Sequence, residues 1–135
     1  MTASVDEYDP DNDPVIEVGR EASRELANAW MVIRTQGLTK WKIRVRDIDA
    51  GTARRQLLWV EIDTSENPVY TSGPVKELWR IDCLAKTQRV EYSERFDRQG
   101  RSTSTRFYEG ARMTQITPAI PVDAVRVAFC APDLE

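Results

Sequence analysis

The sequence VKELWRIDCLAKTQRVEYSERFDRQGRSTSTRF, from Val75 to Phe107, decides the fold. Apolar and polar side chains alternate along residues 75–83 and again along 87–96. A period of two residues is typical of strands that bury one face and expose the other. Two strands alone are only marginally stable, so this stretch predicts a hairpin that pairs with further strands.

The turns within this stretch support antiparallel pairing. The three residues 84–86 are short enough for a hairpin connection, and a second turn, 97–100, ends in Gly100. The alternation in 87–96 predicts that Val90, Tyr92 and Phe96 share one face while Thr87, Arg89, Glu91, Ser93 and Arg95 occupy the other.

Further strands are expected on both sides of the hairpin. An apolar run begins at Trp30, residues 40–46 alternate without exception, and residues 54–63 are apolar on both faces, which fits a central strand. Residues 102–107 carry hydroxyl and charged side chains typical of an edge strand, and residues 109–118 are expected to be a loop. We expect a short helix over 121–130, although Val125, Val127 and Phe129 also alternate as a strand would.

The chain begins with a different composition. Residues 1–13 form an acidic leader without apolar periodicity and are expected to be disordered. Asp13 and Pro14 form a helix start, after which Val15, Val18, Ala22 and Leu26 lie on one stripe. We therefore expect a helix over 14–28, and its docking on the domain stays open. The predicted fold is α+β: one β-rich domain over 14–135, with a curved antiparallel sheet of about six strands, a C-terminal helix and an N-terminal helix.

Charge is unevenly distributed along the 135 residues. Residues 1–25 hold eight acidic and two basic side chains, a net charge of −6, whereas residues 26–135 hold fourteen acidic and seventeen basic ones, a net charge of +3. The acidic tail is either solvated or folds back to mask a basic face. No apolar run is long enough for a transmembrane helix, and no signal peptide is visible, so either the protein is cytoplasmic or a signal segment has been removed.

The absence of histidine excludes much chemistry. No serine or cysteine has a histidine base, and two cysteines alone cannot complete a tetrahedral zinc site. We therefore expect a non-enzymatic protein without cofactor or metal. Asp47 with Asp49, or Glu91 with Glu94, are the acid–base pairs that a carboxylate enzyme would need, and neither pair is expected on one face of a strand.

A row of cations is the candidate binding site. Alternation places Lys40, Lys42, Arg44 and Arg46 on one strand face, and Arg89 can continue this row across the sheet. Such a face would attract an acidic glycan or an acidic protein, although exposed cations also serve simply to prevent aggregation. Nucleic acid is not expected, because Trp41 alternates onto the opposite face. Two other classes remain: a cytoplasmic protein- or polyanion-binding module, and a β domain whose aromatic side chains line a small-ligand cavity.

The two cysteines, Cys83 and Cys130, both lie in apolar surroundings. They permit one intramolecular disulfide, and two buried free thiols in a cytosolic protein fit the composition equally well.

Taken together, several short motifs resemble the bacterial surface-adhesin protein E family. The resemblance spans residues 30–130 and rests on the following features: the strand opening at Trp30, Arg46-Asp47-Ile48-Asp49 after the second strand, Ile81-Asp82-Cys83 at the end of the fourth, an aromatic hairpin through Tyr92, Gly100 in a turn, Ile116-Thr117-Pro118, and the closing Cys130. This sequence departs from the family in lacking a visible export signal and in having Pro118-Ala119-Ile120-Pro121 before the last element.

The resemblance implies an extracytoplasmic binding protein, in the periplasm or on the cell surface. It also implies a curved antiparallel sheet with a terminal helix held by a Cys83–Cys130 disulfide. Attachment to host proteins, the role described for a pathogen's member of the family, is not carried over to this chain.

Overall fold

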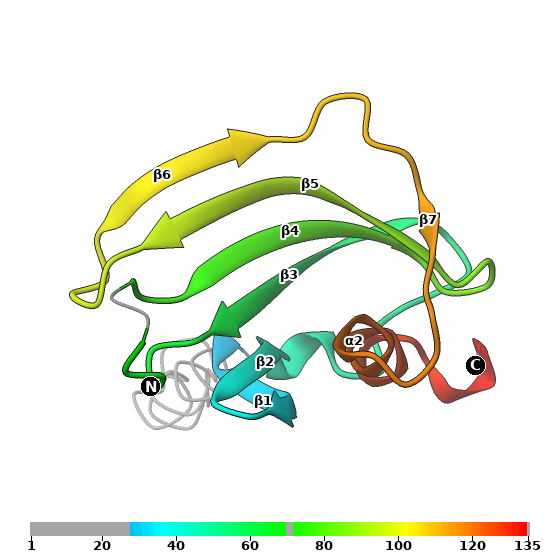
Figure 1. The fold of residues 1–135 in the computed structure, drawn as a ribbon. Helices are drawn as coiled ribbons and strands as arrows, with labels where there is room; N and C mark the ends of the chain where they lie inside the picture. The colour runs from blue at the N-terminus through cyan, green and yellow to red at the C-terminus, as the bar shows by residue number, and fades with distance from the viewer. Residues whose placement is uncertain (1–27, 70–71, 135) are drawn as a thin grey trace, which may run out of the picture.

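The computed structural model describes residues 28–69 and 72–134, which form one antiparallel sheet with a helix beneath it (Figure 1). The strands are β1 (Trp30–Gln36), β2 (Thr39–Arg44), β3 (Gln56–Asp63), β4 (Val75–Asp82), β5 (Thr87–Phe96), β6 (Ser102–Phe107) and β7 (Thr114–Gln115). Helix α2 spans Pro121–Phe129, and two 3-10 turns, η3 (Val45–Asp47) and η4 (Pro132–Leu134), follow β2 and α2.

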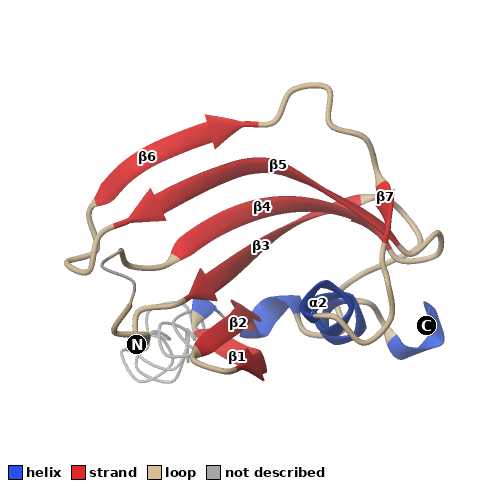
Figure 2. Ribbon diagram, viewed as in Figure 1, coloured by secondary structure: helices blue, strands red, loops and turns tan. Residues whose placement is uncertain are grey.

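Each strand from β2 to β6 pairs antiparallel with the strand before it, so the spatial order is β1-β2-β3-β4-β5-β6. The short β7 pairs with the first residues of β5. Figure 2 shows β3 to β6 arching over α2, so the sheet has a concave inner face toward the helix and a convex outer face away from it. In β4, Trp79 and Ile81 are buried on the inner face, and Leu78 and Arg80 alternate onto the outer face.

The core lies between the inner face and α2. Ile43, Val60 and Trp79 from three adjacent strands pack there with Val125 and Phe129 of the helix. The helix begins at Pro121, whose missing N–H costs nothing in the first turn, and its buried residues recur at helical spacing. Because hydrophobic side chains from distant segments share this one core, the sheet and α2 form a single packing unit.

A disulfide between Cys83 and Cys130 joins the end of β4 to the end of α2, and both residues are fully buried. Gly51 closes the same junction: its N–H donates to the Phe129 carbonyl, and its carbonyl accepts from the Ala131 N–H. A Cβ at residue 51 would lie 2.8 Å from the Cys83 Sγ and 2.9 Å from Cε2 of Phe129. Only glycine fits there, because both neighbours are held in the packed core.

Much of the predicted architecture is confirmed. The structure has the curved antiparallel sheet, the C-terminal helix in place of a strand, the edge strand β6 and the disulfide. The predicted acidic leader (residues 1–13) and the N-terminal helix (residues 14–28) lie outside the described residues, apart from the last position. Among residues 28–69 and 72–134, every helix is too short to cross a bilayer.

Three predictions about strand boundaries and faces were wrong. The strand predicted over 40–46 ends at Arg44, because the chain turns into η3 and Val45 donates to the Ala29 carbonyl. The loop predicted over 109–118 contains β7, which Thr114 ties to the Gln88 carbonyl. Both differences are short local features, a 3-10 turn and a two-residue strand, which the alternation of apolar and polar residues does not predict.

The third error concerns the faces of β5. Leu78 pairs with Tyr92 while Trp79 pairs with Val90, so Glu91 is an extra residue that forms a β-bulge. The bulge reverses the alternation: Val90 packs against the core, whereas Tyr92 lies on the outer face. Val90 and Tyr92 therefore do not share a face as predicted.

Candidate binding surface on the outer face

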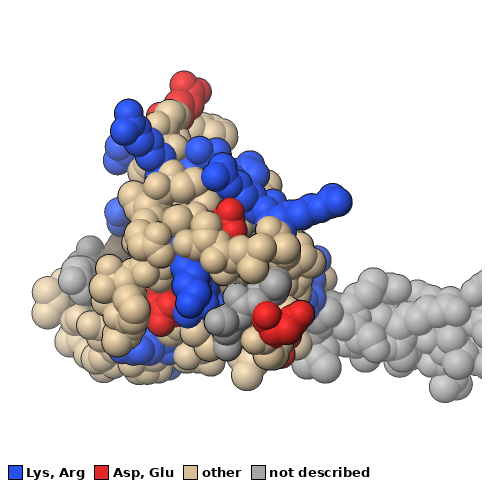
Figure 3. Space-filling view, turned by 90° about the vertical axis from the view of Figure 1, so that its right-hand side faces the viewer, with Lys and Arg blue, Asp and Glu red and all other residues tan. Residues whose placement is uncertain are grey.

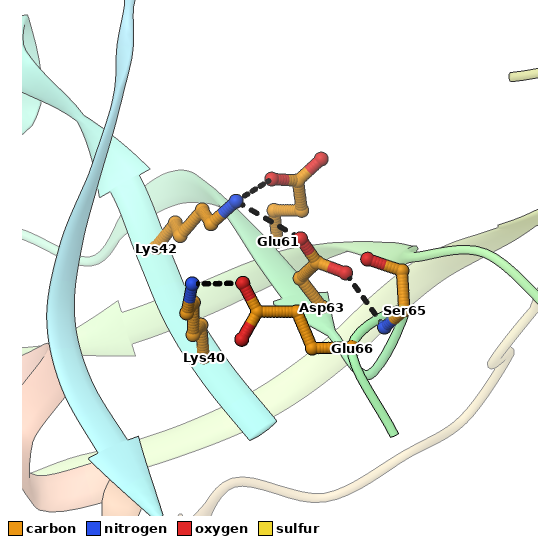
Figure 4. A network of polar contacts seen from close by, with 6 residues as sticks. All are labelled: Lys40, Lys42, Glu61, Asp63, Ser65 and Glu66. Carbon is orange, nitrogen blue, oxygen red and sulfur yellow. Dashed lines mark hydrogen bonds and ion pairs between the residues drawn. The ribbon is translucent and has the colours of Figure 1, made fainter. Parts of the chain in front are cut away.

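The predicted cationic row lies beside an acidic row on β3. Register places Lys42 opposite Glu61 and Lys40 opposite Asp63. The Lys42 Nζ lies 3.0 Å from Asp63 Oδ2 and 3.5 Å from Glu61 Oε2, and the Lys40 Nζ donates to Glu66 Oε1 at 2.6 Å (Figure 4). Both lysines are thus ion-paired, Lys42 with carboxylates of β3 and Lys40 with a carboxylate of the loop that follows β3.

The two arginines of the row are placed differently from each other. The Arg44 guanidinium lies over the Trp30 ring, 5.1 Å from its centroid, whereas Arg46 is exposed in η3 and has left the strand. Next to it, burial raises the pKa of Asp47, and the charges of Arg46 and Arg44 offset part of that rise. The structure therefore does not bring Lys40, Lys42, Arg44 and Arg46 together as one free cationic face.

The contacts between Lys42 and Asp63 shift the pKa values of these two residues in opposite directions. Burial alone would raise the pKa of Asp63, but hydrogen bonds from Ser65 and Lys42 outweigh burial and hold that pKa below its ordinary value. Burial alone would lower the pKa of Lys42, but the hydrogen bond to Asp63 and the charges of Glu61 and Asp63 raise it. Both shifts mean that the charged forms stabilise the fold.

Replacing Lys42 by methionine should lower the free energy of unfolding by about 1–2 kcal/mol at neutral pH, since Glu61 and Asp63 lose their cation. Because the folded pKa of Asp63 is depressed, its contribution is complete above the unfolded pKa and is lost as the pH falls through the folded pKa. The contribution of Lys42 is complete at neutral pH and is lost only in strong alkali, as the pH rises through its raised folded pKa.

Urea denaturation at pH 7 and at pH 3 measures this prediction. The difference between wild type and K42M should be smaller at pH 3 than at pH 7, because the contribution of Asp63 is lost as the pH falls toward its depressed folded pKa. The matched control is K40M, whose pair with Glu66 is more exposed and should contribute less than about 1 kcal/mol. Equal losses for the two variants at pH 7 would contradict the role assigned to Lys42.

Arg89, the remaining predicted residue, lies at another end of the sheet. Here the start of β3, the end of β4, the start of β5 and the loop before β7 meet, as the register shows. We call this the basic end; its cations are Arg54, Arg55, Arg80, Lys86, Arg89 and Arg112. Segments 54–57, 80–91 and 111–115 hold these six basic residues and two acidic ones, Asp82 and Glu91, a net charge of +4. Figure 3 views this end and shows Lys and Arg side chains gathered over its upper part.

Two arginines at the basic end share one carboxylate. Arg80 and Arg89 are opposite each other in the register, and Nε of each contacts Glu91 Oε1, at 2.9 Å for Arg80. Hydrogen bonds from Arg89 and Arg80 lower the pKa of Glu91. Arg89 also donates to the Ala111 carbonyl at 3.0 Å, which fixes the loop that carries Arg112. Since both arginines retain exposed side-chain area, two positive charges face one negative charge at the surface.

Beside the basic end, the outer face carries an apolar row. Register places Trp59, Leu78, Tyr92 and Phe107 directly opposite one another on β3, β4, β5 and β6, and we call them the aromatic ladder. Trp59 and Tyr92 meet edge to face with centroids 5.9 Å apart, and Tyr92 and Phe107 lie 4.8 Å apart. Phe107 is 71% exposed, so the ladder ends in a large apolar side chain open to solvent.

A hollow lies between β1 and α2. Its volume is about 440 Å³, and its lining includes Met31, Val32, Ala124 and Val127. This volume is in the range of small-molecule sites. However, Met31, Val32 and Val127 are 43–49% exposed, so the hollow is an open groove and not the aromatic-lined cavity that the third functional class would need.

The sequence analysis named Arg89 as a candidate but predicted neither the basic end nor the aromatic ladder. Trp59 could have been assigned to the outer face, because it alternates with the buried Leu58 and Val60. Tyr92 could not, since the bulge at Glu91 decides its face. The disulfide pair, Cys83 and Cys130, is where the resemblance placed it, and it lies in the core away from this surface.

Within the part of the chain that the structure describes, no three His, Cys, Asp or Glu side chains gather in a way that would hold a metal ion. The chain matches no known family model, and comparisons with curated proteins and with solved structures return no significant match. The resemblance to the surface-adhesin protein E family therefore finds no support in these comparisons and stays an expectation from short motifs.

Proposed function

We propose that this protein is a non-enzymatic binding domain that recognises an anionic partner through the basic end of its sheet. The observation that carries the proposal is the pairing of Arg80 and Arg89 with a single carboxylate, flanked by exposed Arg54, Lys86 and Arg112. A cluster of cations with a net charge of +4 attracts acidic surfaces and raises their rate of association.

The proposed compartment is the periplasm or the cell surface. Its support is the buried Cys83–Cys130 disulfide, which is compatible with an oxidising compartment. The arched antiparallel sheet and its terminal helix are also what the resemblance to surface-adhesin protein E implies. We keep membership of that family, and an adhesin-like role, as part of the proposal.

Heparin, a sulfated glycan, serves as the anionic probe. The double variant R54Q/R112Q removes two exposed cations of the basic end that make no ion pair with Glu91. Cations near an anionic surface contribute on the order of 1 kcal/mol each, so heparin affinity at low salt should fall at least about tenfold. Wild-type binding should also weaken steeply with added salt.

The matched control is R46Q/R95Q, which removes two exposed arginines elsewhere, one of them from the row predicted from sequence. This variant has the same net charge as R54Q/R112Q. Loss of affinity confined to R54Q/R112Q supports the basic end. Loss confined to R46Q/R95Q would move the site back to the predicted row, and absence of heparin binding by the wild type would overturn the proposal.

A further inference from the structure

We propose that the outer face binds an acidic glycan, whose sugar rings lie against the aromatic ladder while its anionic groups face the basic end. The inference rests on the proposed function, because it extends the same anion-binding surface by a second row of contacts and names the class of ligand. Three features carry it: the spacing of the two rows, the distribution of charge on either side of the ladder, and the shape of the face.

The aromatic ladder and the cations of the basic end form two parallel rows on the outer face. Leu78 belongs to the ladder and Arg80 to the basic end, and these residues are two positions apart on β4. Side chains at this separation point to the same face, about 7 Å apart at about 3.4 Å per residue. Arg80 lies opposite Arg89 in the register, so the cations continue across the sheet parallel to the ladder. A single ligand can therefore contact both rows at once.

The ladder presents an extended aromatic surface. It crosses four strands, which lie about 4.8 Å apart, so its length is about 14 Å. Phe107 is its most exposed member, and Trp59, Leu78 and Tyr92 are half-buried. Because the faces of aromatic rings carry negative partial charge, they attract the weakly positive C–H groups of a sugar ring. Such a surface suits an elongated ligand built of flat, partly apolar rings.

Charge differs on the two sides of the ladder. On the side of the basic end, Arg80 and Arg89 share one carboxylate, and further cations bring the net charge to +4. On the other side, the register aligns Glu61, Lys76 and Glu94, a row with more acidic than basic residues. An anionic ligand on the ladder is therefore attracted on one side and repelled on the other. This asymmetry orients an acidic glycan with its carboxylate or sulfate groups toward Arg80 and Arg89.

The shape of the outer face favours a glycan over a polypeptide. The face is convex (Figure 2), whereas polypeptide partners bind chiefly through side chains that fill well-packed pockets. A convex row of rings offers flat contact instead, and a sugar ring has a flat C–H face with its charged groups at the edge. The hollow between β1 and α2 could hold a side chain, but none of its lining residues belongs to the ladder or to the basic end.

Titration calorimetry of the full chain with heparin tests the inference at Phe107. This side chain is 71% exposed, so it can be changed with little loss of fold stability. F107L keeps an apolar side chain but removes the ring, so heparin affinity should fall at least about threefold. F107W keeps a ring and should bind at least as tightly as the wild type. The matched control is L38A, which removes an exposed apolar side chain between β1 and β2 and should leave the affinity unchanged.

Salt dependence separates the ladder from the basic end. The slope of log affinity against log salt concentration counts the ion pairs formed with a polyanion. F107L should shift this line to lower affinity without changing its slope, whereas R54Q/R112Q should make the slope shallower. If F107L binds heparin as the wild type does at every salt concentration, the inference is overturned, while the result for the basic end and the proposed function stand.

Two further probes test the class of ligand. Poly-L-glutamate carries negative charge on a polypeptide, and phosphatidylglycerol vesicles carry it on a membrane surface. F107L should bind both probes as the wild type does, because they lack sugar rings and meet only the basic end. A loss for F107L on either probe as large as its loss on heparin would overturn the assignment to a glycan, in favour of an acidic polypeptide or an anionic lipid surface.

Discussion

Replacing both cysteines by alanine, C83A/C130A, should lower the free energy of unfolding by about 4 kcal/mol. The bond links residues 47 positions apart, so without it the unfolded chain regains the conformations that the closed loop excludes. Since domains of this size are stable by about 5–15 kcal/mol, the variant keeps only part of its margin.

Urea denaturation of the oxidised wild type and of C83A/C130A measures this loss. The sulfurs lie in a fully buried junction, so under native conditions a reductant should act only through partial opening of α2. Urea opens this junction and exposes the bond to dithiothreitol. The wild type with dithiothreitol present should therefore unfold at the same lower urea concentration as C83A/C130A. Equal midpoints for the oxidised wild type and the alanine variant would show that the bond does not stabilise the fold.

The second large effect is expected at Trp79. Its side chain is 1% exposed at the centre of the inner face, opposite Leu58 and Val90, and its indole N–H donates to Glu77 Oε1 at 2.9 Å. Replacing it by alanine leaves a large cavity between the sheet and α2, and it leaves the Glu77 carboxylate without its donor. We expect a loss of about 3–5 kcal/mol.

Two variants control for this loss in equilibrium unfolding. W79F keeps most of the volume and should lose clearly less than W79A, because it forfeits mainly the bond to Glu77. L57A removes an apolar side chain that is 50% exposed and should cost less than about 1 kcal/mol. A loss for L57A as large as that for W79A would mean that the outer face is also covered in solution.

The sheet could be predicted because its signals are local. Alternation within β2 and β4, the apolar run of β3, the glycine at position 100 and the proline at position 121 depend on neighbouring residues alone. The structure confirms these elements for that reason. The disulfide was not fixed by such local signals; the cysteines left two alternatives, and the resemblance favoured the bond that is present.

The proposed binding surface could not be predicted because it depends on how strands align. Lys42 would be an unpaired cation on its own strand, and it gains its ion pairs only because the register of β3 places Glu61 and Asp63 beside it. In the same way, Arg54 and Arg112 are far apart in sequence and reach the basic end only through the pairing of β3 and β7 with their neighbours. Alternation predicts which face of a strand each side chain occupies, but it does not predict which residue of the neighbouring strand lies opposite.

The order of the strands bears on how the protein is made. Because every strand from β2 to β6 pairs with its predecessor, the sheet can assemble stepwise from β1 onward, each strand adding to an edge that already exists. Helix α2 and Cys130 follow all of these strands in the chain. Cys83 therefore has no partner within its own molecule until Cys130 has been made. With only two cysteines in the chain, no mispaired bridge within one molecule competes during that wait.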